Sequence, residues 1–240
     1  VNVAGTYTVT VTASNGCTST SSTTVGENIT PPTVTTSNDG PLTCAKTSVT
    51  LTATGGGSYL WSGGGTSSTK VVNVAGTYTV TVTASNGCTS TSSTTVGENI
   101  TPPTVTTSND GPLTCAKTSV TLTATGGGSY LWSGGGTSST KVVTLAGTYT
   151  VTVTASNGCT STSSTTVGEN ITPPTVTTSN DGPLTCTKTS VTLTAIGGGS
   201  YLWSGGGTSS TKVVTVAGTY TVTVTASNGC SSTSSTTVGE

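Results

Sequence analysis

The chain has 240 residues, a net charge of −1, 5% charged residues and no His. A surface so poor in Lys excludes nucleic-acid binding, which needs basic side chains to neutralise phosphates. Without His, Ser–His and Cys–His nucleophile pairs are excluded. We therefore expect a protein that is not an enzyme and has no catalytic residues and no cofactor. No apolar run is long enough for membrane insertion in this segment.

The sequence is a tandem repeat with a period of 71 residues. The interval separates Cys17, Cys88, Cys159 and Cys230, and also Cys44, Cys115 and Cys186. Such self-similarity predicts an array of equivalent structural units. We expect full units at 30–100 (repeat 1), 101–171 (repeat 2) and 172–240 (repeat 3). Residues 1–29 copy residues 72–100 letter for letter, so they form the C-terminal part of a truncated repeat.

Repeat 1 shows six short segments with strand character. They are 33–37, 48–54, 58–62, 69–74, 77–84 and 89–96. The third lies between two Gly runs, and the fifth places Tyr78, Val80 and Val82 on one face with Thr on the other. The last, TSTSSTTV, alternates poorly, so we expect its register to be weakly specified. Short strands at this spacing without a helical period predict an all-β antiparallel sandwich.

The pattern SVTLTA…YLW…GTYTVTV resembles strands B, C and F of immunoglobulin-like (Ig-like) domains. The resemblance places Trp61, Trp132 and Trp203 at the core position of strand C, and Tyr78, Tyr149 and Tyr220 at the tyrosine corner. The units also resemble PKD-like and Ig-like repeats of large bacterial cell-surface adhesins, especially those of the Bacteroidetes, which often read GTYTVTVT…NGC. The resemblance implies a tandem array of small Ig-like sandwiches with a structural or adhesive role. Such an array would form an extracellular stalk or filament at the bacterial cell surface.

Two Cys in each full repeat, with no His and no CxxC, suggest disulfides formed in an oxidising compartment. The Ig-like alignment places Cys44 before strand B and Cys88 in the F–G turn, at opposite ends of the sandwich. A six-residue strand spans roughly 20 Å, whereas a disulfide needs Cα atoms within about 7 Å. This favours bonds between repeats, Cys44 with Cys159 and Cys115 with Cys230. A bond within each repeat, and free or intermolecular thiols, remain alternatives.

Other candidate sites have a plainer explanation. Glu98, Asn99 and Asp110 offer oxygens for calcium at a junction, but they are too few for its usual six to eight ligands, so we expect no metal site. The Thr row of strand 77–84 is typical of an exposed strand, and the twist of Ig-like sheets argues against a flat ice-binding face. The Gly-rich loops beside Tyr59 and Trp61 leave one functional alternative, a multivalent glycan-binding module. The expected partners are neighbouring copies of the repeat, in the same chain or in another chain of a filament.

Overall fold

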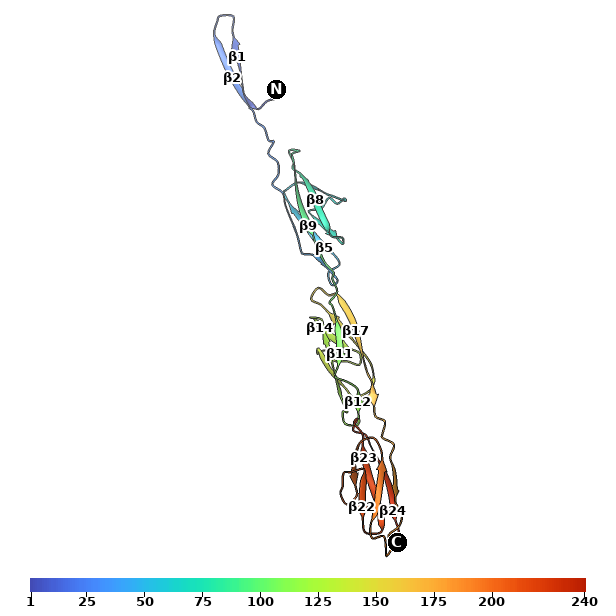
Figure 1. Ribbon diagram of the computed structural model, residues 1–240. Helices are drawn as coiled ribbons and strands as arrows, with labels where there is room; N and C mark the ends of the chain where they lie inside the picture. Colours follow the sequence, from blue (N-terminus) through green and yellow to red (C-terminus); the bar gives the residue numbers. More distant parts are fainter. The chain divides into compact units, whose positions relative to one another are not determined.

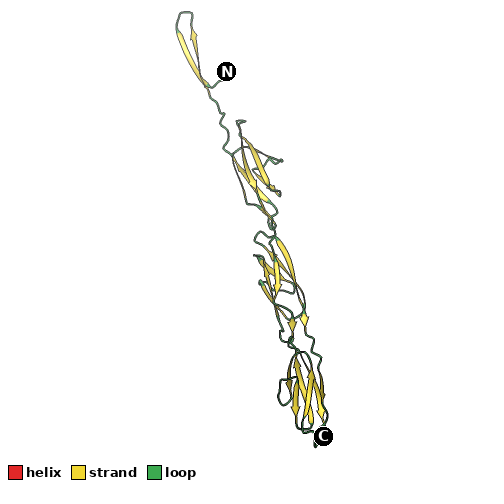
Figure 2. Cartoon of the chain, in the orientation of Figure 1, coloured by secondary structure: helices red, strands yellow, loops and turns green.

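The computed structural model describes residues 1–240, which form strands, turns and loops (Figures 1 and 2). No helix is present that is long and apolar enough to cross a membrane. The chain divides into two compact units, Val1–Thr101 and Pro102–Glu240. The first unit contains the truncated repeat and repeat 1, and the second contains repeats 2 and 3.

The strands recur in each repeat. The truncated repeat has β1 (Gly5–Thr12) and β2 (Thr18–Val25). Repeat 1 has β3 (Thr35–Asn38), β4 (Leu42–Thr43), β5 (Val49–Thr54), β6 (Ser58–Trp61), β7 (Thr69–Val72), β8 (Gly76–Thr83), β9 (Thr89–Val96) and β10 (Glu98–Asn99). Repeat 2 has β11 (Thr106–Asn109), β12 (Leu113–Thr114), β13 (Val120–Thr125), β14 (Ser129–Trp132), β15 (Thr140–Val143), β16 (Gly147–Thr154), β17 (Thr160–Val167) and β18 (Glu169–Asn170). Repeat 3 has β19 (Thr177–Asn180), β20 (Val191–Ile196), β21 (Ser200–Trp203), β22 (Thr211–Val214), β23 (Gly218–Thr225) and β24 (Ser231–Val238).

Each full repeat is a sandwich of two antiparallel three-stranded sheets. In repeat 1 the sheet orders are β3-β5-β7 and β6-β8-β9, and repeats 2 and 3 have the same arrangement. These orders correspond to strands A-B-E and C-F-G of an Ig-like sandwich. The predicted all-β, Ig-like fold is therefore confirmed. Figure 1 labels three strands of the repeat 3 sandwich, β22, β23 and β24.

The core of each repeat follows from the period-2 alternation of its strands. In β5 the inward residues Val49 and Leu51 are completely buried, and Val80 of β8 is as well. Trp61 of β6 stands opposite Val80 in the sheet register and is only 2% exposed. Trp132 and Trp203 are equally buried in the cores of repeats 2 and 3.

The polar groups of the aromatic side chains donate hydrogen bonds to backbone carbonyls. The Trp61 indole N–H donates to Ser67 O at 2.9 Å. The Tyr78 hydroxyl donates to Val74 O at 2.8 Å, four residues upstream, which is the geometry of a tyrosine corner. Tyr149 and Tyr220 make the equivalent bonds to Leu145 O and Val216 O.

The last strand of each repeat is held mainly by polar side chains, together with one buried Val at its end. All eight residues of β9 pair with β8, and alternate residues of β9 turn inward. Ser92 Oγ lies 2.9 Å from Thr36 Oγ1 of β3 in the opposite sheet. Asn38 Nδ2 donates to Thr94 Oγ1 at 2.7 Å. The expectation of a weakly specified register was wrong, because hydrogen bonds between the sheets distinguish the two faces of this strand.

Two local predictions also need correction. The segment predicted at 69–74 ends as a strand at Val72, because the chain turns there and Val74 supplies the acceptor for the Tyr78 hydroxyl. The short parallel pair β4–β10 was missed, because two-residue strands carry no periodic signal. Its equivalent in the second unit is β12–β18.

The hairpin β1–β2 has the same register as the F–G hairpins of the full repeats. Val9 and Val11 are 58% and 63% exposed, whereas the equivalent Val80 and Val82 are buried completely. The difference shows that the A-B-E sheet supplies the burial of strand F.

Truncation of one core Trp should destabilise its repeat strongly. Trp61→Ala removes a buried indole and leaves a cavity, so we expect a loss of about 3–5 kcal/mol. Leu60→Ala is the matched control, because Leu60 lies on the other face of the same strand and is 59% exposed. Its effect should stay within about 0.5 kcal/mol. Urea unfolding followed by circular dichroism measures both, and equal curves for the two variants would contradict the assigned core.

Candidate functional site

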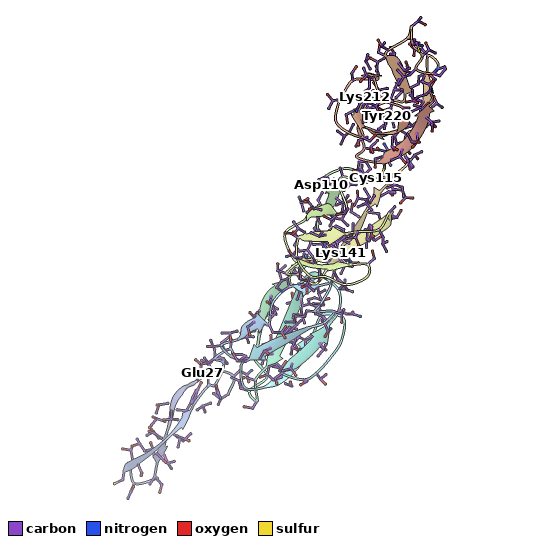
Figure 3. The ribbon with its side chains drawn as sticks, turned by 90° about the horizontal axis from the view of Figure 1, so that it is seen from below. Glu27, Asp110, Cys115, Lys141, Lys212 and Tyr220 are labelled. Atoms are coloured by element: carbon purple, nitrogen blue, oxygen red, sulfur yellow. A yellow bond between two sulfur atoms is a disulfide. The ribbon has the colours of Figure 1, made fainter.

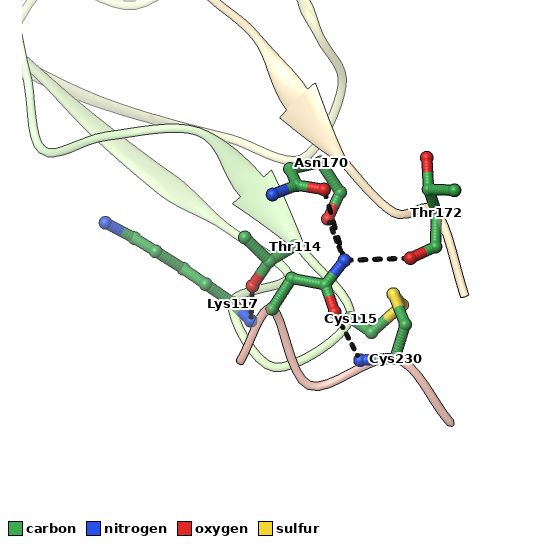
Figure 4. The surroundings of a disulfide bond; sticks show 7 residues. Thr114, Cys115, Lys117, Asn170, Thr172 and Cys230 are labelled. Carbon is green, nitrogen blue, oxygen red and sulfur yellow. Dashed lines mark hydrogen bonds between the residues drawn. A yellow bond between two sulfur atoms is a disulfide. The ribbon is translucent and has the colours of Figure 1, made fainter. Parts of the chain in front are cut away.

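The strongest candidate site is the contact between repeats 2 and 3 in the second unit, which we call the junction. It combines the loop after β12 that carries Cys115 and Ala116, the linker at 170–172, and the turn at 226–230 between β23 and β24 (Figure 4). The turn has the sequence Ala-Ser-Asn-Gly-Cys. Each of the three parts contributes backbone or side-chain contacts.

The turn is shaped by its own hydrogen bonds. Ala226 N donates to Cys230 O at 2.9 Å, and Gly229 N donates to Ala226 O at 2.9 Å. The side-chain oxygen of Asn228 accepts from Cys230 N at 3.0 Å. Gly229 has φ = +79°, a left-handed conformation that favours glycine. The same turn at the tip of the β1–β2 hairpin keeps these bonds, so the turn forms without a partner.

Asn228 fixes the linker through its amide nitrogen. Nδ2 donates towards Asn170 O at 3.2 Å, Asn170 Oδ1 at 3.1 Å and Thr172 O at 3.0 Å. Because an amide group has two N–H donors, the three acceptors share them. In the first unit, Asn86 contacts Asn28 and Thr30 in the same way. The turn of a repeat therefore holds the linker that leads into that repeat.

The turn also packs closely against the loop of repeat 2. Ala116 N donates to Asn228 O at 3.2 Å. A Cβ added to Gly229 would lie 2.5 Å from the Ala116 Cβ, so only glycine fits. At Gly87, whose turn has no such loop beside it, nothing lies within 4 Å of the same position. The glycine of the turn thus allows close approach as well as the left-handed backbone.

A disulfide joins Cys115 to Cys230 across the junction, with a Cα–Cα distance of 4.9 Å. This is one of the two pairs favoured from the sequence. It closes a loop with a sequence separation of 115 residues, which in the chain-entropy account stabilises the folded state by about 5 kcal/mol. The Cys230 side chain is nearly fully buried. The pairing of Cys44 with Cys159, which would join the two units, stays a prediction.

Three cysteines are free in the structure. Cys17 and Cys186 are exposed and Cys88 is half-buried. Cys17 and Cys88 occupy the turn position of Cys230, and Cys186 occupies the loop position of Cys115.

The linker leaves repeat 2 from a paired segment. In the parallel pair β12–β18, Leu113 stands opposite Glu169 and Thr114 opposite Asn170. Leu113 N donates to Gly168 O at 2.9 Å, and the Leu113 side chain is buried. Contacts within repeat 2 itself therefore fix the linker and the loop of Cys115 to each other.

Of the residues considered for calcium, Asp110 is bound within its own repeat, in the same environment as its equivalent Asp181. Asp181 Oδ1 lies 3.0 Å from Lys188 Nζ and accepts from Thr192 N at 3.0 Å. The Lys188 ammonium and the Thr192 amide lower the pKa of the Asp181 carboxyl, so it is ionised and bound within its own repeat. Asp39 and Asp110 have the same environment. No three His, Cys, Asp or Glu side chains come together as a metal site.

The Gly-rich loop between strands C and E is closed by a lysine. Lys212 Nζ donates to Ser204 O at 2.5 Å and Gly206 O at 2.8 Å. The ammonium also lies 5.8 Å from the centre of the Tyr220 ring, and both residues are labelled in Figure 3. Such a contact is a cation–π interaction. The loop is thus held against the sandwich in each repeat by the second of its two lysines.

Asn228→Asp should loosen the junction while leaving the cores intact. The substitution removes the amide donors, so the three acceptor oxygens of the linker lose their hydrogen bonds and face carboxylate oxygens instead. Leaving these polar groups without partners destabilises the contact. We expect faster amide hydrogen exchange in the linker at 170–176 and no change in β20 or β23. Asn15→Asp is the matched control, because the structure gives Asn15 a bond only through its oxygen to Cys17 N. Equal exchange in the linker of the Asn228→Asp and Asn15→Asp variants would contradict the assigned role.

The comparisons with known proteins agree with the fold. No family model matches the chain, and no curated protein matches its sequence. A solved structure of a 1.5-MDa bacterial ice-binding adhesin matches with a TM-score of 0.55 and 15% identity, over 89% of this chain and 98% of that one. A Ca²⁺-stabilized adhesin with which an Antarctic bacterium binds ice matches with a TM-score of 0.56 and 17% identity, over 99% of this chain and 81% of that one. The chain is therefore similar in fold to domains of large bacterial adhesins.

Proposed function

We propose that this chain is a non-enzymatic structural and adhesive repeat array, part of an extracellular stalk or filament at a bacterial cell surface. Each 71-residue repeat would be one domain, with a truncated repeat at 1–29. The observation that carries the proposal is the Cys115–Cys230 disulfide, which ties one repeat to the next. Disulfides persist in oxidising compartments, which supports a location outside the cytoplasm. The similarity in fold to large bacterial adhesins gives further support.

The junction has the features of a connection that resists tension. The linker is held by the amide of Asn228, by the strand pair β12–β18 and by the covalent bond at its side. Tension applied along the chain would pass through the disulfide before it reached the linker. Residues between Cys115 and Cys230 would then be shielded from extension.

The alternative of a multivalent glycan-binding module has less support. Stacking on sugars requires exposed aromatic rings, whereas Trp61 is buried and bonded to Ser67 O. Tyr59 packs against the core cluster of the same repeat. The Gly-rich loops are closed onto the sandwich by Lys70 and its equivalents. Ice and calcium binding belong to the two structural neighbours and are not part of this proposal.

Pulling the chain by its two ends tests whether the junction resists tension. While the disulfide is intact, the residues between Cys115 and Cys230, which have a sequence separation of 115, cannot extend. At about 3.3–3.6 Å per residue, its removal should release roughly 400 Å of additional contour length. Single-molecule force spectroscopy measures this difference between a Cys44→Ser/Cys159→Ser chain and the double variant Cys115→Ser/Cys230→Ser made in that background. The shared background removes the predicted Cys44–Cys159 bond, which would otherwise keep an equally short covalent path between the chain ends.

Cys88→Ser serves as the control, because Cys88 is free in the structure. Its extension should match that of the unchanged chain. An unchanged contour length in the double variant would show that the junction does not shield repeat 3 from tension.

A further inference from the structure

The turn at 226–230 contains an Asn-Gly pair, which is chemically reactive. Asn is one of the thermolabile residues of proteins. When glycine follows it, the glycine nitrogen can attack the carbon of the Asn side-chain amide, since glycine has no Cβ to block the approach. The chain carries this pair in every turn of this kind and nowhere else. The four pairs are Asn15-Gly16, Asn86-Gly87, Asn157-Gly158 and Asn228-Gly229.

Neither residue of the pair at the junction can be exchanged without loss of a contact. Nδ2 of Asn228 donates to Asn170 O, Asn170 Oδ1 and Thr172 O, as the dashed lines in Figure 4 show. Gly229 cannot be larger, because an added Cβ would lie 2.5 Å from the Ala116 Cβ. The residues that close the junction are therefore the same two that can react with each other.

The turn positions the amide group of Asn228 for this reaction. Its Oδ1 accepts from Cys230 N at 3.0 Å, which is an Asx turn and folds the side chain back over the Gly229 peptide. When the Gly229 nitrogen attacks Cγ, the negative charge develops on Oδ1. The Cys230 N–H already donates to this oxygen, and a fixed N–H in that place stabilises the developing charge.

The linker opposes the reaction by holding the leaving group. Attack makes Cγ tetrahedral and turns Nδ2 out of the amide plane, which would break its three hydrogen bonds to the linker. The Ala116–Asn228 backbone bond and the Cys115–Cys230 disulfide keep the turn against these acceptors. Asn15 has the same Asx turn to Cys17 N, but the structure gives it a bond only through its oxygen. The closed junction thus restrains a group that its own turn prepares to react.

We propose that Asn228 is a self-modification site, at which deamidation is prevented while the junction is closed and proceeds when it opens. The product is Asp or isoaspartate, and neither carries an N–H donor on its side chain at neutral pH. The bonds to Asn170 and Thr172 cannot form again, so an opening that lasts long enough becomes permanent. This inference goes beyond the proposed function and needs only the contacts of the junction.

The reaction consumes one water and releases one ammonia. Hydroxide removes the proton of the Gly229 nitrogen, and this nitrogen forms a bond to Cγ of Asn228. The Cγ–Nδ2 bond breaks, Nδ2 takes a proton from water, and ammonia leaves behind a cyclic imide. Water then opens the ring. Addition at Cγ gives Asp, and addition at the main-chain carbonyl carbon gives isoaspartate. Nothing is oxidised or reduced.

Incubation of the full chain in warm, slightly alkaline buffer tests the protection by the junction. Reduction and cleavage after Lys and Glu, at mildly acidic pH to stop the reaction, yield peptide 213–240 with Asn228 and peptide 1–27 with Asn15. Tandem mass spectrometry locates the modified position in each peptide. We expect Asn15 to react several-fold faster than Asn228, because their turns share one sequence and differ in the bonds of Nδ2. Equal rates would overturn the proposal.

Two variants open the junction in different ways. Cys115→Ser/Cys230→Ser removes the covalent bond, and Asn170→Ala removes one acceptor of Nδ2 while the disulfide stays intact. Each should speed the deamidation of Asn228 several-fold. Asn99→Ala, the same change in the linker that follows repeat 1, is the matched control and should leave the rate unchanged. An unchanged rate in either junction variant contradicts the proposal, as does an equal rise in Asn99→Ala.

The modified chain itself tests the consequence. Each deamidation adds one negative charge, so anion-exchange chromatography separates the product from the unmodified chain. The fraction modified at position 228 should show faster amide hydrogen exchange in the linker at 170–176, with β20 and β23 unchanged. Equal linker exchange in the two fractions would show that the reaction does not open the junction, and the proposal would fail. The force measurement on the disulfide is independent of this outcome, so the proposed function and the modification site can fail separately.

Discussion

The small apolar core of each repeat is the constraint on which the rest of the structure depends. Repeat 1 buries nine apolar residues, of which one is Trp and none is Phe or Met. Domains of this size gain little net stability from burial alone. The remaining stability must come from polar contacts between the sheets and from connections between repeats. The Ser92–Thr36 and Asn38–Thr94 bonds supply the first. The Cys115–Cys230 bond supplies the second.

This constraint accounts for the composition of the F–G hairpin. Strand F carries the buried Val80 and Val82, while strand G presents Ser and Thr hydroxyls that pair with strands A and F. The turn that joins them is Ser-Asn-Gly-Cys, and each position after Ser has a separate role at the junction. Asn228 binds the linker, Gly229 allows close approach, and Cys230 forms the covalent bond. One short sequence thus shapes the turn and connects neighbouring repeats.

Most of the fold could be predicted from the sequence because the strands alternate clearly. The positions of Trp61 and Tyr78 relative to Ig-like strands identified strands B, C and F, and hence placed the two cysteines of a repeat at opposite ends of the sandwich. The two-residue strands at 42–43 and 98–99 carry no period and could not be found. In strand 89–96 most inward residues are Ser or Thr, as are the outward ones, so a hydrophobicity pattern does not distinguish the two faces. The two faces differ in the hydrogen bonds that their hydroxyls make. Asn228 contacts linker residues that lie 56 and 58 positions away in the sequence, and no local pattern predicts such contacts. The recurrence of Asn-Gly-Cys was the one sign that this turn has a role.

Disulfide mapping of the non-reduced chain tests the central claim, that the covalent bonds connect one repeat to the next. Cleavage after Lys and Glu separates peptides 99–117, 170–188 and 213–240, which carry Cys115, Cys186 and Cys230. An Ala45→Ser marker gives peptide 28–46 a mass different from the otherwise identical 99–117. The structure predicts that 213–240 is joined to 99–117. A bond between 213–240 and 170–188, both within repeat 3, would contradict the account.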